Sequence, residues 1–193
     1  QRKILFQIQV GKYPFDLEMN DDRTELYVLS SDDNAIYVID VNERKLKKTI
    51  PVMAGSTALF YDGNYLWVGG HGMYRDLNEF IYLYDPKSGE LVKKIAVGSM
   101  PIFFHDEADL NYVGVLCHGS HELYIVDRRS YEVIAKKEVG TNPYYMISDD
   151  SFLYISGMDS HDVSIVDKRS FQLKKIVKVK DGPYAMVIGG QYE

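Results

Sequence analysis

A unit of about forty residues recurs four times along this chain, and this repeat constrains the fold more than any other feature. Each copy closes an apolar run with an aspartate, and these four marker aspartates are Asp40, Asp85, Asp127 and Asp167. They lie 45, 42 and 40 residues apart. A period of about 40–45 residues, made of strands and turns, is typical of a β-propeller.

Each unit divides into four expected strands, which we name a to d in chain order. A turn of the type Gly-x-x-Pro comes before strand a, as in 11–14, 98–101 and 140–143. Strands b and c are nearly continuous apolar runs, which indicates a sheet covered on both faces. We therefore predict an all-β fold, a β-propeller of four-stranded antiparallel blades. The expected blades are at about 11–52, 55–97, 98–139 and 140–179.

The two ends of the chain suggest a further, split blade. Residues 3–10 resemble a strand d and residues 181–193 begin like a strand a, which gives a partial blade with open edges. We expect the chain to be a section of a larger propeller, with the ring completed by further blades or by another chain. A closed ring of five blades is the alternative.

Composition narrows the classes of partner. The formal net charge of −6 argues against a nucleic-acid partner, which needs clustered cations in excess. No apolar run approaches the roughly 18 residues of a membrane span. Cys117 is the single cysteine, so the chain has neither an internal disulfide nor a Cys-rich zinc or haem-attachment motif. We expect Cys117 to be a small buried hydrophobe.

The repeat resembles a known family. The segments "LYVLSSDDNAIYVIDVNERKLKKTIPV" from Leu26 and "LYISGMDSHDVSIVDKRSFQLKKIVKV" from Leu153 are similar to the YVTN-type β-propeller repeat of surface-layer-like and cytochrome d1-like propellers. This resemblance implies an extracytoplasmic (periplasmic or cell-surface) propeller, usually of about seven blades. It does not imply one activity, because function lies in sites and not in the fold.

Propeller connectivity places the b–c loops and the d–a turns on one rim, where we expect a ligand to bind. Four of the five histidines fall in b–c loops: His71, His118, His121 and His161. The longest b–c loop, 69–79, also carries Tyr74 and Arg75. The d–a turns contribute the remaining candidates, Tyr13, Met100, Asn142 and Tyr144.

Histidines in neighbouring loops suggest metal binding, since neutral imidazole is a common ligand. The candidate metal ligands are His118, His121 and His161. Their spacing matches no established ligand motif, and ordinary polar rim residues are the alternative. We predict no cofactor from the sequence, with a metal or haem as the alternative.

The sequence shows no catalytic constellation, because its serines lack a nucleophile-elbow context and no phosphate-binding glycine loop occurs. The leading hypothesis is a non-catalytic binding or scaffold propeller that uses this rim to bind a protein or a small ligand. The alternative is a propeller subunit of a metal- or haem-dependent periplasmic oxidoreductase, with rim histidines near the cofactor. A structural surface-layer unit is a third hypothesis.

Overall fold

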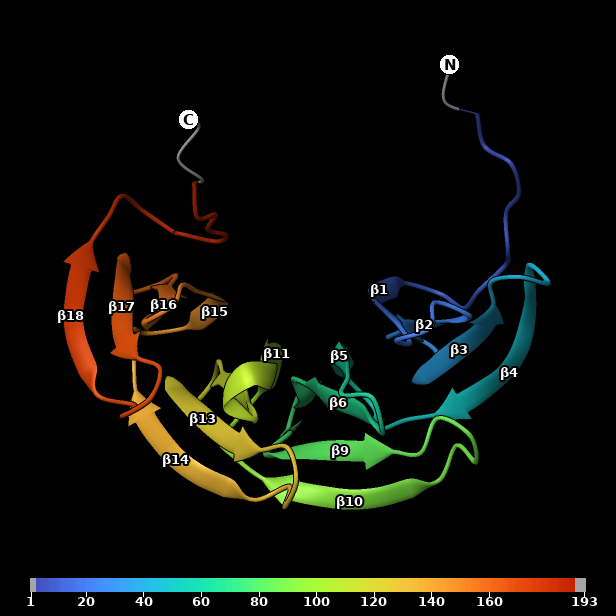
Figure 1. The fold of residues 1–193 in the computed structure, drawn as a ribbon, viewed down its shortest axis with the longest axis horizontal. Helices are drawn as coiled ribbons and strands as arrows, with labels where there is room; N and C mark the ends of the chain where they lie inside the picture. The colour runs from blue at the N-terminus through green and yellow to red at the C-terminus, as the bar shows by residue number, and fades with distance from the viewer. Residues whose placement is uncertain (1–2, 190–193) are drawn as a thin grey trace. The chain divides into compact units, whose positions relative to one another are not determined.

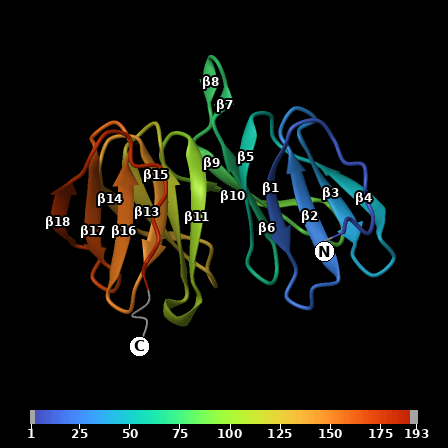
Figure 2. The same cartoon turned by 90° about the horizontal axis from the view of Figure 1, so that it is seen from above.

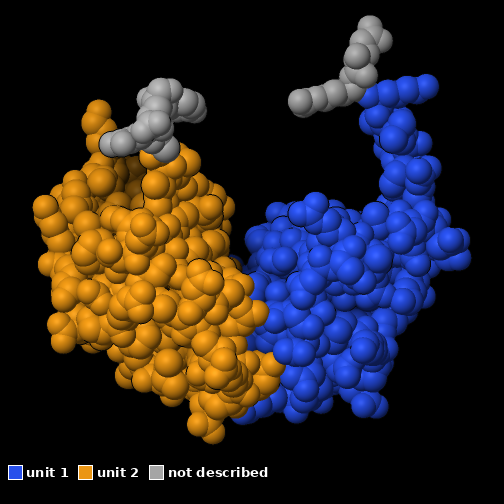
Figure 3. All heavy atoms as spheres, in the orientation of Figure 1, with its two compact units in different colours: residues 1–94 blue, residues 95–193 orange. Residues whose placement is uncertain are grey.

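The computed structural model describes residues 3–189, and these residues form strands and turns with no α-helix (Figure 1). Among residues 3–189, sixteen strands make four antiparallel sheets of four, and two short strands make a separate hairpin. The described residues contain no helix with the length and hydropathy that a membrane span requires. The chain divides into two compact units, residues 1–94 and 95–193 (Figure 3).

The first sheet lies in the first unit and has the order β1-β2-β3-β4. Its strands are β1 (Pro14–Met19), β2 (Glu25–Ser30), β3 (Ala35–Asp40) and β4 (Lys45–Pro51). The second sheet has the order β10-β9-β6-β5. Its strands are β5 (Ser56–Tyr61), β6 (Leu66–Gly70), β9 (Phe80–Tyr84) and β10 (Leu91–Ala96).

An apolar core joins these two sheets. Leu29 and Ile36 of the first sheet are fully buried in one cluster with Leu66 and Val68 of the second. The backbone amide of Leu59 also donates to the carboxylate of Asp16, at 2.8 Å, across the two sheets. Burial of each such side chain stabilises the fold by about 1.5–3 kcal/mol, so stacking of sheets is what holds this unit together.

The second unit repeats this arrangement. The third sheet contains β11 (Pro101–Glu107), β12 (Tyr112–Cys117), β13 (Glu122–Asp127) and β14 (Val133–Glu138), with a 3₁₀ turn, η1 (Ala108–Leu110), after β11. The fourth contains β15 (Pro143–Ser148), β16 (Phe152–Gly157), β17 (Asp162–Asp167) and β18 (Leu173–Lys178). Every residue of β12 is buried, as expected for a strand covered on both faces. Cys117, at its end, is fully buried.

The marker aspartates fix the turn between strands c and d. The carboxylate of Asp127 accepts hydrogen bonds from the backbone amides of Arg129 and Ser130, at 2.9 and 2.8 Å. Asp167 binds Arg169 and Ser170 in the same way. These amides lower the pKa of both carboxyl groups, since they stabilise the ionised form. The repeated aspartate is therefore a turn residue.

The two ends of the described chain carry no assigned strand, over 3–13 and 179–189. A strand is defined by hydrogen bonds to a neighbouring strand. Within the described residues, neither segment is paired with a strand in this way. Residues 190–193 of the expected partial blade lie outside the described residues. The split blade and the four blade boundaries remain predictions of the sequence analysis.

Candidate functional site

Backbone hydrogen bonds tie the b–c loop and the d–a turn of a sheet together. The amide of Ser31 donates to the carbonyl of Tyr13 (3.0 Å), and the amide of His118 donates to the carbonyl of Met100 (2.9 Å). The amide of Met158 donates in the same way to Asn142 (3.0 Å). These loops therefore share one end of their sheet, and we call the residues there the rim.

Asn34, His121 and His161 occupy equivalent rim positions, one residue before strand c. All three have a left-handed backbone, with φ of 51°, 61° and 53°, a conformation in which Asn and His are enriched. The carbonyl of each accepts the amide of the valine 18 residues later. The main chain therefore has the same local conformation at all three positions.

Each of these side chains also accepts a backbone amide 21 residues later. The acceptor–amide distances are 3.3 Å for Asn34 Oδ1 to Gly55, 3.2 Å for His121 Nδ1 to Asn142 and 3.1 Å for His161 Nδ1 to Gly182. Oδ1 of Asn and Nδ1 of His are both bonded to Cγ, so either can fill the position. We call this contact the loop latch, because it joins one b–c loop to the d–a turn of the next repeat.

The loop latch bears directly on the metal hypothesis. When Nδ1 accepts an amide, the proton of the neutral ring lies on Nε2, and neither nitrogen is then free to ligate a metal. His121 Nδ1 also lies 3.0 Å from the carbonyl oxygen of His118. Nδ1 cannot donate to this oxygen and accept from the Asn142 amide at the same time. Since Asn34 Oδ1 and His161 Nδ1 both accept an amide at the equivalent position, we assign His121 Nδ1 as an acceptor too.

No group of three or more His, Cys, Asp or Glu side chains within residues 3–189 is placed to hold a metal. The assignment of His118, His121 and His161 as ligands remains a prediction. The latch gives two of the three another role.

The other rim candidates lie in two separate places. In the second unit, the ring of His118 meets that of Tyr144 edge-on, with centroids 5.9 Å apart, and the Tyr184 hydroxyl donates to that of Tyr144 at 2.9 Å. This hydrogen bond and burial raise the pKa of Tyr144 to about 12. In the first unit, His71 Nδ1 lies 3.2 Å from Thr57 Oγ1, and burial lowers the pKa of the imidazole. His71 is therefore neutral at pH 7.

The long b–c loop of the second sheet folds into a hairpin, β7 (Gly72–Met73) and β8 (Asp76–Leu77). Figure 2 shows this β7–β8 hairpin extending past the ends of β5 and β6. Its turn presents Tyr74 and Arg75 to solvent, and the Tyr74 side chain is 93% exposed.

The foot of the hairpin is fixed. Gly72 has φ of +77°, and its amide donates to the carbonyl of Gly55 at 3.4 Å. A Cβ on Gly72 would lie 2.5 Å from the Asn78 amide nitrogen, so glycine is required there. The buried Asn78 side chain accepts the amide of Phe80 (3.0 Å) and donates to its carbonyl (2.8 Å). A rigid sheet thus holds an exposed hairpin.

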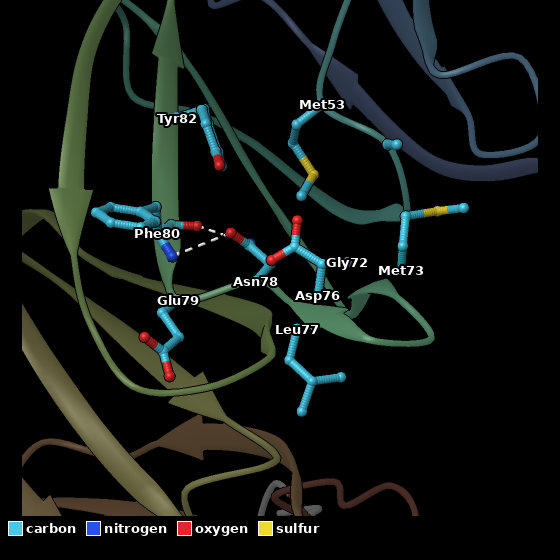
Figure 4. Close-up of a pocket in the computed structure, with 10 residues that line it drawn as sticks. Met53, Gly72, Met73, Asp76, Leu77, Asn78, Glu79, Phe80 and Tyr82 are labelled. Carbon is cyan, nitrogen blue, oxygen red and sulfur yellow. Dashed lines mark hydrogen bonds between the residues drawn. The ribbon is translucent and has the colours of Figure 1, made fainter.

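A pocket of about 330 Å³ lies beside the hairpin. Figure 4 shows the Asp76 carboxylate, the Tyr82 hydroxyl and the Met53 side chain pointing toward one another, with Glu79 and Met73 turned away. Burial raises the pKa of Tyr82, and the charge of Asp76 raises it further. The phenol is therefore neutral and can donate or accept a hydrogen bond.

The sequence places Tyr74 and Arg75 on this loop but shows no sign of the pocket beside it. Phe80 and Tyr82 belong to an apolar strand-c run, FIYLY, and Met53 follows strand d, so nothing in the pattern distinguished them from core residues. A usable signal was loop length, since this b–c loop is the longest of the four.

A buried charged cluster in the second unit also escaped the sequence analysis. Glu107 forms an ion pair with Lys168 (Oε2–Nζ 2.9 Å), and its Oε1 lies 3.3 Å from Nε2 of His105. The Ser148 hydroxyl approaches that same nitrogen, at 3.1 Å. A catalytic serine and carboxylate would need opposite nitrogens of the ring. The cluster instead connects β11 with β15.

These sheets define the class of the protein: the fold is a β-propeller, as predicted. Hydrazine synthase from Kuenenia stuttgartiensis is similar to this chain, with a TM-score of 0.73 and 19% sequence identity. The match covers 86% of this chain and 49% of the hydrazine synthase chain. Dihydro-heme d1 dehydrogenase NirN, in complex with DHE, is also similar, with a TM-score of 0.71 and 16% sequence identity. This match covers 91% of this chain and 40% of the NirN chain.

The chain therefore spans half or less of the length of these two structures. No protein-family model and no curated protein matches it. At such identities the similarity shows the fold and nothing finer.

Proposed function

We propose that this chain belongs to an extracytoplasmic binding propeller of the YVTN type, in which the β7–β8 hairpin docks a protein partner. The hairpin carries this proposal, because it exposes Met73, Tyr74, Arg75 and Leu77 together on a fixed base. Tyr, Met and Arg are enriched in the energetically dominant part of protein interfaces. A rigid base also lowers the entropic cost of binding.

Site-specific photo-crosslinking tests this docking in the native cells. The crosslinking residue p-benzoylphenylalanine replaces Tyr74 in one variant and, as a matched control, Tyr131 of a c–d turn in another. We expect one adduct of defined mass from position 74 that disappears when Arg75 is changed to Ala. The absence of an adduct at 74, or the same adduct from both positions, contradicts the proposal.

The comparisons favour a second candidate, a propeller subunit of a haem- or metal-dependent oxidoreductase. One similar structure is named for haem d1. The latch histidines fit poorly as axial ligands, because Nδ1 of His121 and of His161 accepts a backbone amide. His71 and His118 are the remaining rim donors.

Absorption spectra with added haem, together with metal analysis, test this candidate. A stoichiometric Soret shift that is lost in His118→Ala or His71→Ala supports it. Unchanged free-haem spectra and metal-free protein exclude it for this chain.

A further inference from the structure

We infer that the pocket beside the β7–β8 hairpin takes a lysine side chain of the docked protein, with its ammonium group between the Asp76 carboxylate and the Tyr82 hydroxyl. This inference rests on the proposed function, since it names the group that the docking site recognises. The geometry that carries it is the convergence of one anionic and one neutral oxygen in a pocket of mixed polar and apolar lining, whose apolar side chains include Met53 and Phe80.

The charge of the pocket selects a cation. Asp76 comes from β8, and its carboxylate is directed toward Met53 and Tyr82 (Figure 4). An ammonium group donates three hydrogen bonds and accepts none, so it matches a carboxylate and a phenol oxygen. A carboxylate or phosphate ligand would be repelled by Asp76. Hydrogen bonds to a charged acceptor are roughly twice as strong as neutral ones.

The walls of the pocket suit a linear alkyl stem. Met53, Phe80 and Tyr82 line it, and its volume of about 330 Å³ has room for one extended side chain. Lysine buries its methylene groups along apolar surface while its charged end stays at a polar edge. Methionine adapts its shape readily to such a stem.

The side chain of Lys94 places a positive charge near Tyr82. Lys94 Nζ is 5.2 Å from the centroid of the Tyr82 ring, so it covers a face of that ring and not its hydroxyl. Its charge weakens the binding of a second cation, and its removal should strengthen it. This gives a variant whose effect has the opposite sign to that of Asp76.

The test uses Nα-acetyl-lysine methylamide as the probe, with ¹H–¹⁵N spectra of the 193-residue chain. Nα-acetyl-norleucine methylamide has the same stem without the charge and is the matched ligand control. We expect amide shifts confined to the residues around Met53, Asp76 and Tyr82, with a Kd of about 1 mM, as is usual for so small a ligand. The norleucine analogue should leave the spectrum unchanged.

Substitutions then test which side-chain charge binds the ammonium group of the probe. Asp76→Asn should weaken probe binding by about tenfold, and Lys94→Met should tighten it. Glu79→Gln is the control, because Glu79 also lines the pocket but its carboxylate turns away from Asp76 and Tyr82 in Figure 4. A change from about 50 to about 500 mM NaCl should weaken binding to the wild type more than to Asp76→Asn.

The inference is overturned by an absence of shifts, by equal binding of the norleucine analogue, or by equal losses in Asp76→Asn and Glu79→Gln. Tighter binding of n-pentylamine than of the lysine probe would point to a free amine and contradict a protein side chain. If crosslinking at position 74 fails while the lysine probe still binds, the docked protein is contradicted and the pocket binds an amine of another source. If crosslinking succeeds while the probe does not bind, docking at the hairpin is supported and the lysine pocket is contradicted.

Discussion

At the scale of single residues, the rim is organised by an acceptor atom one bond beyond Cγ. Asn34, His121 and His161 each place that atom on an amide 21 residues further along the chain. A histidine in this position is held by the repeat itself, whatever the loop binds. The repeat thus explains two of the four rim histidines without a ligand.

Substitution of His121 tests the loop latch. His121→Asn should leave stability within a few tenths of a kcal/mol, because Asn34 makes the same contact in the first sheet. His121→Ala should cost about 1–3 kcal/mol, through the lost hydrogen bond and the strain of alanine in a left-handed conformation. Urea unfolding followed by circular dichroism measures both.

His121→Gly separates the two causes, since glycine relieves the strain and still lacks the acceptor. A loss for His121→Asn as large as that for His121→Ala would mean that the imidazole has a role beyond the latch.

His105 predicts a pH dependence of stability. Burial lowers its pKa below the ordinary value, and the nearby Glu107 charge opposes this only in part. As pH falls below about 6.5, the unfolded chain takes up the proton before the folded chain does, so stability is lost with acid. His105→Gln should therefore show a smaller loss of unfolding free energy between about pH 7.5 and 5.5.

Other groups that titrate near this window, such as Asp106, whose pKa is raised mainly by burial, are present in both proteins, so the difference between the two profiles reports His105. His71, whose pKa is also lowered by burial, keeps its own contribution in the variant. For Glu107, burial would raise the pKa, but hydrogen bonds from Lys168 and Ser148 outweigh it and lower the pKa, so this carboxyl titrates only in stronger acid. Parallel pH profiles for the variant and the wild type would contradict the assignment to His105.

At the scale of elements, the same repeat position is buried in one sheet and exposed in another. Leu59 of β5 is 4% exposed in the core between the first two sheets, whereas Leu17, its counterpart in β1, is 60% exposed. Leu17 also lines an apolar groove of about 430 Å³ with Phe6, Leu26 and Ile39. The exposed face of β1 has the chemistry of a face that another sheet covers.

Paired alanine substitutions measure this difference. Leu59→Ala should cost about 2–5 kcal/mol, because it leaves a cavity, and Leu17→Ala less than about 0.5 kcal/mol. The fluorescence of Trp67, the single tryptophan and fully buried in the first unit, reports the unfolding of that unit. Equal losses would show that the face of β1 is covered in solution, and unfolding midpoints that depend on protein concentration would then identify a second copy.

The strands were predictable from the sequence and the hairpin was not. The runs from Leu26 and Leu153 carry their own strand pattern and turn aspartates, so they specify β2–β3 and β16–β17 directly. Strands of two residues, such as β7 and β8, are too short for any periodicity. Their position depends on the close approach of Gly72 to Gly55, which no local pattern shows.

At the scale of the whole molecule, the repeat predicted the β-propeller and left the function open. The period predicts sheets that stack, but the site depends on which loop is lengthened and on contacts between residues far apart in sequence, such as His105 and Ser148. The four rim histidines lie between strands b and c of their sheets. Their tautomers and partners depended on backbone geometry that the sequence does not reveal.

Within each unit, each sheet is stabilised by the sheet packed against it, and the hairpin extends from its sheet without being part of this core. Amide hydrogen exchange of the 193-residue chain tests both statements. We expect the slowest exchange in β2, β6, β12 and β16, at the rate set by global unfolding, and fast exchange across Met73–Asp76. Exchange in β6 as fast as in the hairpin would contradict this expectation.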